Sequence, residues 1–171
     1  MKATVWQRLD LIGRVLTPSL IAVALVIVSV VPLHIPGYAP VIPSLALMAV
    51  YYWVLHRPDL LPAVAVFFVG ILHDILTGGP LGVQASILLV AYWVTGSQRR
   101  LFLEKSFLVV WWGFMMIAAG AAIMQWILMS LIFGTLIVPQ PAVFAYLLTV
   151  AIYPLFAWTF VRAQRTLPRA A

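Results

Sequence analysis

Six apolar runs, each close to 20 residues long, follow one another along this chain and constrain its fold more than any other feature. A helix of about 20 apolar residues crosses the hydrocarbon core of a bilayer. The chain has 171 residues, 65% of them apolar, which is more apolar side chain than one small soluble core can cover. We therefore expect an all-α integral membrane protein with six transmembrane helices. The expected spans are about 18–36, 40–56, 60–77, 81–97, 106–133 and 141–161.

The Lys and Arg residues predict the orientation of these spans, because short loops rich in them stay in the cytoplasm. All ten lie before the first span, after the sixth, or in the connections after the second and fourth. The other three connections contain none. This pattern predicts a multi-pass protein of a bacterial inner membrane with both termini in the cytoplasm. We expect an interfacial amphipathic segment at 1–16, a six-helix domain at 17–162 and a basic tail at 163–171.

The charges and the missing motifs argue against several classes of function. The net charge is +6, but the basic residues form short clusters between apolar runs, so no nucleic acid partner is expected. The chain has no cysteine and none of the common catalytic signatures. We expect no enzyme activity, no cofactor and no metal. His34, His73 and Asp74 share an approximate depth, but neighbouring residues of a helix point about 100° apart, which is poor geometry for a joint site.

Asp74 is the one acid within an apolar run, where a carboxylate is costly unless it is paired, hydrated or protonated. Glycines surround it at helical spacing, and a Gly-Gly-Pro turn leads directly into the fourth run. The carboxyl group can accept hydrogen bonds from the start of the fourth helix and lock the hairpin. Contact with a partner, and transport or catalysis, are the alternatives. The motif consists of Gly70, Asp74, Gly78, Gly79, Pro80, Leu81, Gly82 and Ala85.

A second group of small residues lies in the fifth run, where small side chains let helix backbones approach closely. Packing within the protein and docking of a partner helix both explain it. The polar side chains of both the fourth and the fifth run are expected to form hydrogen bonds between helices rather than to line a pore. They are Gln84, Ser86, Thr95, Gln125 and Ser130. The group of small residues consists of Gly113, Ala118, Gly120 and Ala121.

The stretch FFVGILHDILTGGPLGVQA, residues 67–85, resembles the rod shape-determining protein family MreD. The pattern G-x-x-x-D-x-x-x-G-x-x-L-G-x-x-A carries this resemblance. His73 departs from it, because an apolar residue is expected there. Outside this hairpin the likeness is one of length, hydropathy and orientation.

The resemblance implies a non-enzymatic scaffold of the cell-elongation machinery that maintains rod shape and directs side-wall peptidoglycan synthesis. It implies as partners an MreC-like membrane-anchored periplasmic protein, the MreB filament, and the glycan polymerase and transpeptidase that build the wall. The family is also similar in fold to the substrate-binding subunits of energy-coupling-factor vitamin transporters.

Two alternatives to the scaffold make different predictions. A transporter subunit predicts a polar pocket that opens outward and a pair of small residues four apart in the first span, and the span lacks an A-x-x-x-A pair. A lipid-modifying enzyme predicts an acid–base pair of Asp74 with His34 or His73.

Overall fold

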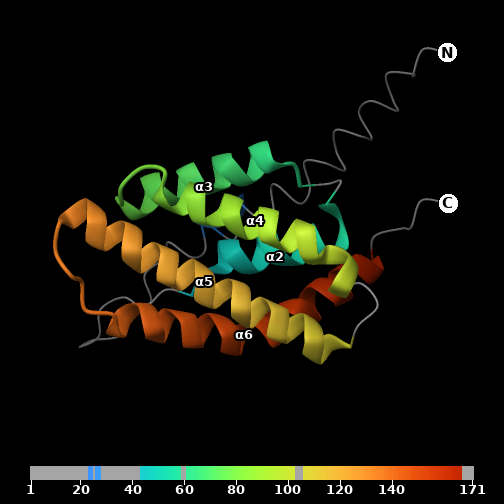
Figure 1. The fold of residues 1–171 in the computed structure, drawn as a ribbon. Coiled ribbons are helices and arrows are strands. Elements are labelled where there is room, and N and C mark those ends of the chain that lie inside the picture. The colour runs from blue at the N-terminus through green and yellow to red at the C-terminus, as the bar shows by residue number, and fades with distance from the viewer. Residues whose placement is uncertain (1–22, 25, 28–42, 59–60, 103–105, 167–171) are drawn as a thin grey trace, which may run out of the picture.

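The structure is a computed structural model that describes residues 23–24, 26–27, 43–58, 61–102 and 106–166. This part of the chain contains five helices and, at residues 23–24 and 26–27, short helical pieces (Figure 1). The interfacial segment expected at 1–16, most of the first span, and residues 167–171 of the basic tail lie outside the described residues. The helices are α2 (Leu45–His56), α3 (Ala63–Thr77), α4 (Val83–Phe102), α5 (Phe107–Phe133) and α6 (Gln140–Thr166).

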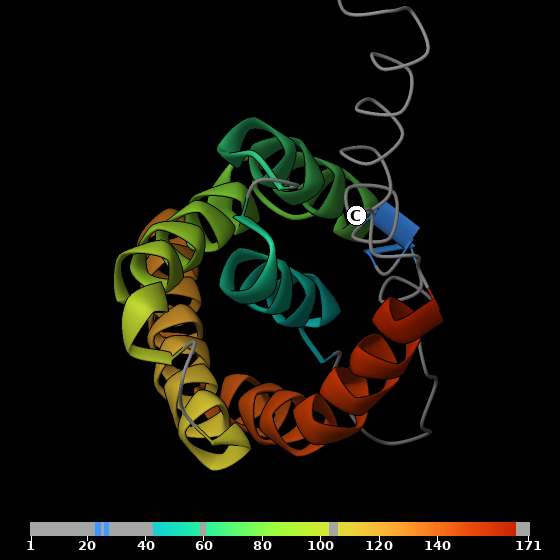
Figure 2. The same ribbon diagram turned by 90° about the vertical axis from the view of Figure 1, so that its right-hand side faces the viewer.

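Helix α2 forms the centre of the bundle. Viewed from its end, α3, α4, α5 and α6 surround it (Figure 2). Its ten residues from Ala46 to Leu55 are all buried. This agrees with its composition, since a helix that is apolar on every side gains most when every side is covered.

An aromatic cluster joins α2 to the two long helices. The Tyr51 ring of α2 lies 5.2 Å from the Phe114 ring of α5, which stacks on Tyr153 of α6 at 4.0 Å. The Tyr51 hydroxyl group donates a hydrogen bond to the Val110 carbonyl at 2.8 Å. The polar end of a buried tyrosine is thus paired, as a low-dielectric interior requires.

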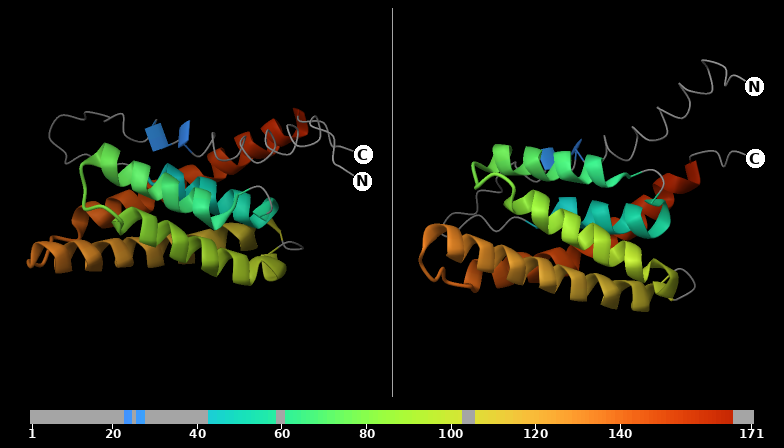
Figure 3. Two further views of the ribbon diagram at one scale, coloured as in Figure 1. Left: turned by 90° about the horizontal axis from the view of Figure 1, so that it is seen from above. Right: turned by 45° about the horizontal axis from the view of Figure 1, so that its top comes forward.

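The ends of α4 and α2 meet at the end of the bundle that carries the basic residues. Arg99 donates a hydrogen bond through Nε to the Leu55 carbonyl at 3.1 Å, so the last turn of α4 lies against the last turn of α2. Arg57 follows α2 directly. The turn between α3 and α4 lies at the opposite end (Figure 3).

Within the described residues, two helical stretches are long and apolar enough to cross a membrane, Phe107–Phe133 and Gln140–Thr159. Helices α2 and α3 are apolar but shorter, with 12 and 15 residues. The all-helical architecture agrees with the expected fold class. The six spans and their orientation stay predictions.

Several helix bounds differ from the apolar runs. Helix α4 continues to Phe102 and α6 to Thr166, past the expected ends at 97 and 161. Gln and Arg are good helix formers, so a helix continues beyond the point where its apolar run stops. Helix α3 begins at Ala63, because Pro62 is extended, with φ −68° and ψ 152°. Helix α6 continues through Pro154.

Candidate functional site

The end of α3 is built by a left-handed glycine. Gly78 has φ +65°, a conformation that costs other residues about 1–2 kcal/mol. Its N–H donates to the Ile75 carbonyl at 3.3 Å, and the Gly79 N–H donates to the Asp74 carbonyl at 3.1 Å. This pair of bonds is the Schellman arrangement, which closes a helix. Gly78 therefore ends the helix instead of sharing a helical face with Gly70 and Asp74, as its four-residue spacing had indicated.

The turn into α4 contains a second glycine with positive φ. Gly82 has φ +94°, and the Val83 N–H donates to the Pro80 carbonyl at 3.4 Å. Helix α4 begins at Val83, so Pro80 and Leu81 belong to the turn. These two residues precede the helix because the backbone at Gly82 is not helical.

The Asp74 carboxyl group joins the two helices. It is 4% exposed, and both of its oxygens are used. Oδ2 accepts a hydrogen bond from the Gly82 N–H at 2.8 Å, and Oδ1 accepts one from the Gln84 N–H at 3.1 Å. The first N–H groups of a helix have no partner within the helix and attract acidic side chains. The hydrogen bonds expected between Asp74 and the start of the fourth helix are present.

Gly70 places the two backbones in contact. A Cβ atom built on Gly70 would lie 2.3 Å from the Ala85 Cα and 2.7 Å from the Ala85 nitrogen. No side chain fits there without displacing α4, and Ala85 is itself 1% exposed. The structure thus brings Gly70, Asp74, Gly82 and Ala85 together across the hairpin. Leu81 points away from it and is 70% exposed.

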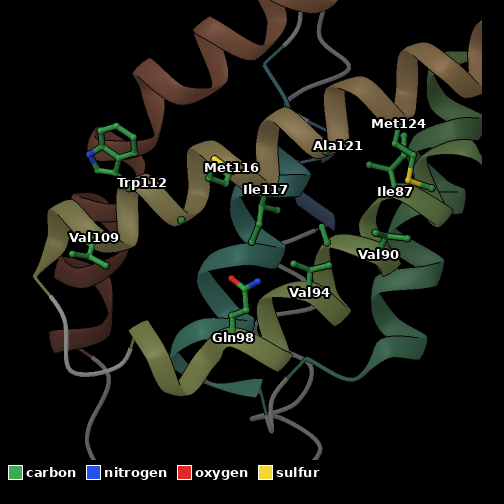
Figure 4. Close-up of a pocket in the computed structure, with 13 residues that line it drawn as sticks. Ile87, Val90, Val94, Gln98, Val109, Trp112, Met116, Ile117, Ala121 and Met124 are labelled. Atoms are coloured by element: carbon green, nitrogen blue, oxygen red, sulfur yellow. The ribbon is translucent and has the colours of Figure 1, made fainter.

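The small residues of α5 do not form one face. Ala118 is 3% exposed and belongs to the protein core. Gly113, Gly120 and Ala121 line a groove of about 460 Å³ between α4 and α5. Figure 4 shows Trp112, Met116 and Met124 of α5 on one wall, with Val90, Val94 and Gln98 of α4 on the other. A Cβ atom on Gly120 would meet nothing within 4 Å.

In the described part of the chain, the side-chain hydrogen bonds expected between helices are not found. Ser86 donates to the Gly82 carbonyl at the start of its own helix, at 2.6 Å, and the Ser130 hydroxyl group has no partner there. Thr95 donates to the carbonyl of Ala91 in its own helix, at 2.6 Å. Among the described residues, no hydrogen bond reaches the Gln84 carboxamide, although the residue is only 6% exposed. Gln84 lines a cavity between several helices, and no local pattern of residues indicates such a position.

The described part of the chain contains no group of three His, Cys, Asp or Glu residues suited to a metal. His34 lies outside it. No hydrogen bond joins the His73 and Asp74 side chains there, and both oxygens of Asp74 are bound to backbone N–H groups. The arrangement around Asp74 holds two helices together and offers few free lone pairs for chemistry.

The helices expose many large apolar side chains, and two helical stretches among the described residues are long and apolar enough to cross a membrane, as in a helical membrane protein. Comparison with family models gives a match to the rod shape-determining protein MreD over residues 10–163. The chain belongs to the MreD family, whose role is the determination of rod shape. Searches of curated proteins and of solved structures found no significant match.

Proposed function

We propose that this protein is a non-enzymatic scaffold of the cell-elongation machinery and contacts an MreC-like membrane-anchored protein. Through that contact it works with the MreB filament and with the polymerase and transpeptidase that build side-wall peptidoglycan. The family match over residues 10–163 carries this proposal. It also ranks the rod-shape role above that of a vitamin-type transporter subunit.

The proposed topology is six spans in the inner membrane with both termini in the cytoplasm. The position of the basic residues supports it. Arg57, Arg99 and Arg100 lie at one end of the bundle, and the uncharged Gly78–Gly82 turn lies at the other (Figure 1). Such an asymmetry is what the positive-inside rule requires.

The groove between α4 and α5 is the proposed contact for the transmembrane helix of the MreC-like partner. The described residues that line it are apolar apart from Gln98 and the indole of Trp112. Gly113 and Gly120 leave the α5 backbone accessible, with open space above Gly120. Van der Waals packing over small residues is the main attraction between helices in lipid, so this surface fits an apolar helix.

Affinity purification from native membranes tests the scaffold role. We expect an MreC-like protein to be retained in mild detergent, and depletion of this protein to turn rod-shaped cells round. If the partner is not retained and depletion leaves the cells rod-shaped, the scaffold proposal is wrong. Recovery of an ATP-driven energising subunit instead would favour the transporter.

The proposed contact of the partner helix with the groove between α4 and α5 is tested by a larger side chain at Gly120. Gly120→Leu fills open space without touching the core, so the protein should fold while recovery of the partner falls about tenfold. Ala151→Leu adds similar bulk to an exposed position of α6 and serves as the matched control. Equal recovery of the partner with both variants would place the contact elsewhere.

A further inference from the structure

A second cavity, of about 300 Å³, lies between α2, α4, α5 and α6. Ser44 and Gln84, at the starts of α2 and α4, line it, as do Trp126 of α5 and Pro141 at the start of α6. It therefore lies at the same end of the bundle as the Asp74 turn, away from Arg57 and Arg99. Its volume is at the lower end of the range for small-molecule sites.

The Gln84 carboxamide is a buried polar group that opens into this cavity without a partner. The residue is 6% exposed and lines the cavity, and its backbone N–H is held by Asp74 at 3.1 Å. No hydrogen bond to its side chain exists among the described residues. The amide atoms of Gln84 are not among the fully buried polar atoms that lack a partner, so they are open to the cavity and available to a bound group.

Among the other polar side chains around the cavity, those of Thr149 and Trp126 already have partners. The Thr149 hydroxyl group accepts a hydrogen bond from the Ser44 N–H at 3.0 Å and donates to the Ala145 carbonyl. The Trp126 indole donates to the Ile137 carbonyl at 2.8 Å. The carboxamides of Gln84 and Gln125 and the hydroxyl group of Ser44 then remain for a ligand.

The absence of charged side chains among the described residues that line the cavity limits the kind of ligand it can bind. No Asp, Glu, Lys, Arg or His is among the described residues that line the cavity. An ion placed there would be desolvated without a counter-charge, which is strongly unfavourable. A carboxamide both donates and accepts hydrogen bonds, and its natural complement is another uncharged amide. Ile87, Met129 and Val138 supply apolar walls beside it.

We propose that this cavity binds an uncharged small molecule through an amide group that pairs with Gln84, with Gln125 as a second contact. Asp74 is a positioning residue for this site, because it holds the backbone of Gln84 at the start of α4. The site goes beyond the scaffold role, and it does not depend on the groove between α4 and α5.

The experiment measures ligand-induced stabilisation of the full chain in lipid nanodiscs. The probes are N-acetylglucosamine and N-methylacetamide, and glucosamine is the charged analogue that lacks the amide. With a probe about tenfold above a dissociation constant of about 10 mM, we expect the unfolding midpoint to rise by about 3–6 °C. Glucosamine should give no rise. If both amides raise the midpoint, the amide group alone is recognised. If N-acetylglucosamine raises it and N-methylacetamide does not, the site also contacts the sugar ring.

Gln84→Leu should abolish the rise in the unfolding midpoint. Gln98→Leu makes the same change in the groove between α4 and α5, outside the cavity, and should leave the rise unchanged. If Gln84→Leu does not fold, Gln125→Leu, at an exposed position, should weaken binding about fivefold. A rise that is the same in wild type and in the foldable cavity variants would overturn the proposal. So would no rise with either amide, which would mean that water alone satisfies Gln84. Recovery of the MreC-like partner from membranes is measured separately. The ligand proposal can therefore be wrong while the scaffold proposal holds, and the reverse.

Discussion

Two helical hairpins in the described part of the chain, α3–α4 and α5–α6, begin alike and are then held by different means. Helices α3 and α5 both end at a left-handed glycine, Gly78 with φ +65° and Gly134 with φ +63°. After Gly78, a buried carboxyl group connects α3 to the backbone of α4. After Gly134, the loop 135–139 is apolar and exposed, with Leu136 86% exposed.

A single hydrogen bond from α5 reaches that second loop, from the Trp126 indole to the Ile137 carbonyl at 2.8 Å. The difference shows what a turn residue can and cannot do. Glycine lets a chain reverse, but the register of two helices needs contacts across them. In the first hairpin, Asp74 and the backbone contact at Gly70 provide these contacts.

The largest effect is expected at the backbone contact. Gly70→Val places a branched side chain where a Cβ atom alone lies 2.3 Å from the Ala85 Cα, so the two helices must separate. We expect a loss of about 3 kcal/mol or more in the free energy of unfolding. The measurement is unfolding of the purified protein in detergent. Gly120→Val, where a Cβ meets nothing within 4 Å, is the control. Similar stability of the two variants would show that the α3 and α4 backbones are not in close contact at Gly70 and Ala85.

The next effect is at the carboxyl group. Asp74→Ala leaves the Gly82 and Gln84 N–H groups without acceptors and should cost about 2–4 kcal/mol. Asp74→Asn keeps one acceptor oxygen and should cost about half as much. Hydrogen exchange at the two amides gives a direct readout, with faster exchange expected in both variants. Unchanged protection in Asp74→Ala would mean that Asp74 does not hold the hairpin. Loss of cell shape by a stable Asp74→Asn variant would favour a chemical or partner role.

Replacing either of the glycines that end α3 and α5 by alanine should lower the free energy of unfolding by the same amount. Gly78→Ala and Gly134→Ala each put a side chain at a φ near +64° and should cost about 1–2 kcal/mol. Gly79 has no positive φ, and Gly79→Ala should cost less than about 0.5 kcal/mol. Thermal unfolding of the three variants in parallel ranks them. A much larger cost at Gly78 than at Gly134 would mean that the Asp74 contacts depend on the conformation of Gly78.

The smallest effect is expected at the second hairpin. Trp126→Phe keeps the aromatic ring but removes the bond to the Ile137 carbonyl, at a cost of about 1 kcal/mol. Combined with Asp74→Asn, its cost should add, because the two bonds share no partner. Unfolding of the single and double variants measures this. A clear departure from additivity would couple the two hairpins.

The Asp74 hairpin could be predicted from sequence because its parts lie within 16 residues of one another. An acid in an apolar run, followed by glycines and a proline, leaves few arrangements in which its oxygens are satisfied. The end of α3 at Thr77 agrees with the expected span, but the start of α4 at Val83 lies two residues after the expected position. They depend on the backbone angles of Gly78 and Gly82, and glycine adopts both helical and left-handed values.

The position of α2 at the centre could not be predicted. Helices α2 and α5 are both apolar on every side, yet α2 is buried and much of α5 is exposed. Lipid and protein interior accept the same side chains, so periodicity does not separate a helix covered by protein from one that faces lipid. For the same reason, the division of Ala118 from Gly113 and Gly120 required the structure, as did the cavity beside Gln84.

The length of α2 has a consequence for the depth of the bundle. Twelve residues of helix measure about 18 Å, which is shorter than the roughly 30 Å of a hydrocarbon core. Helix α5, with 27 residues, measures about 40 Å. Helix α2 is therefore much shorter than α5, and the cavity lined by Ser44 and Leu47 lies at its first turn. Adding helical residues to α2 at its Ser44 end would fill this cavity without changing the helices that surround α2.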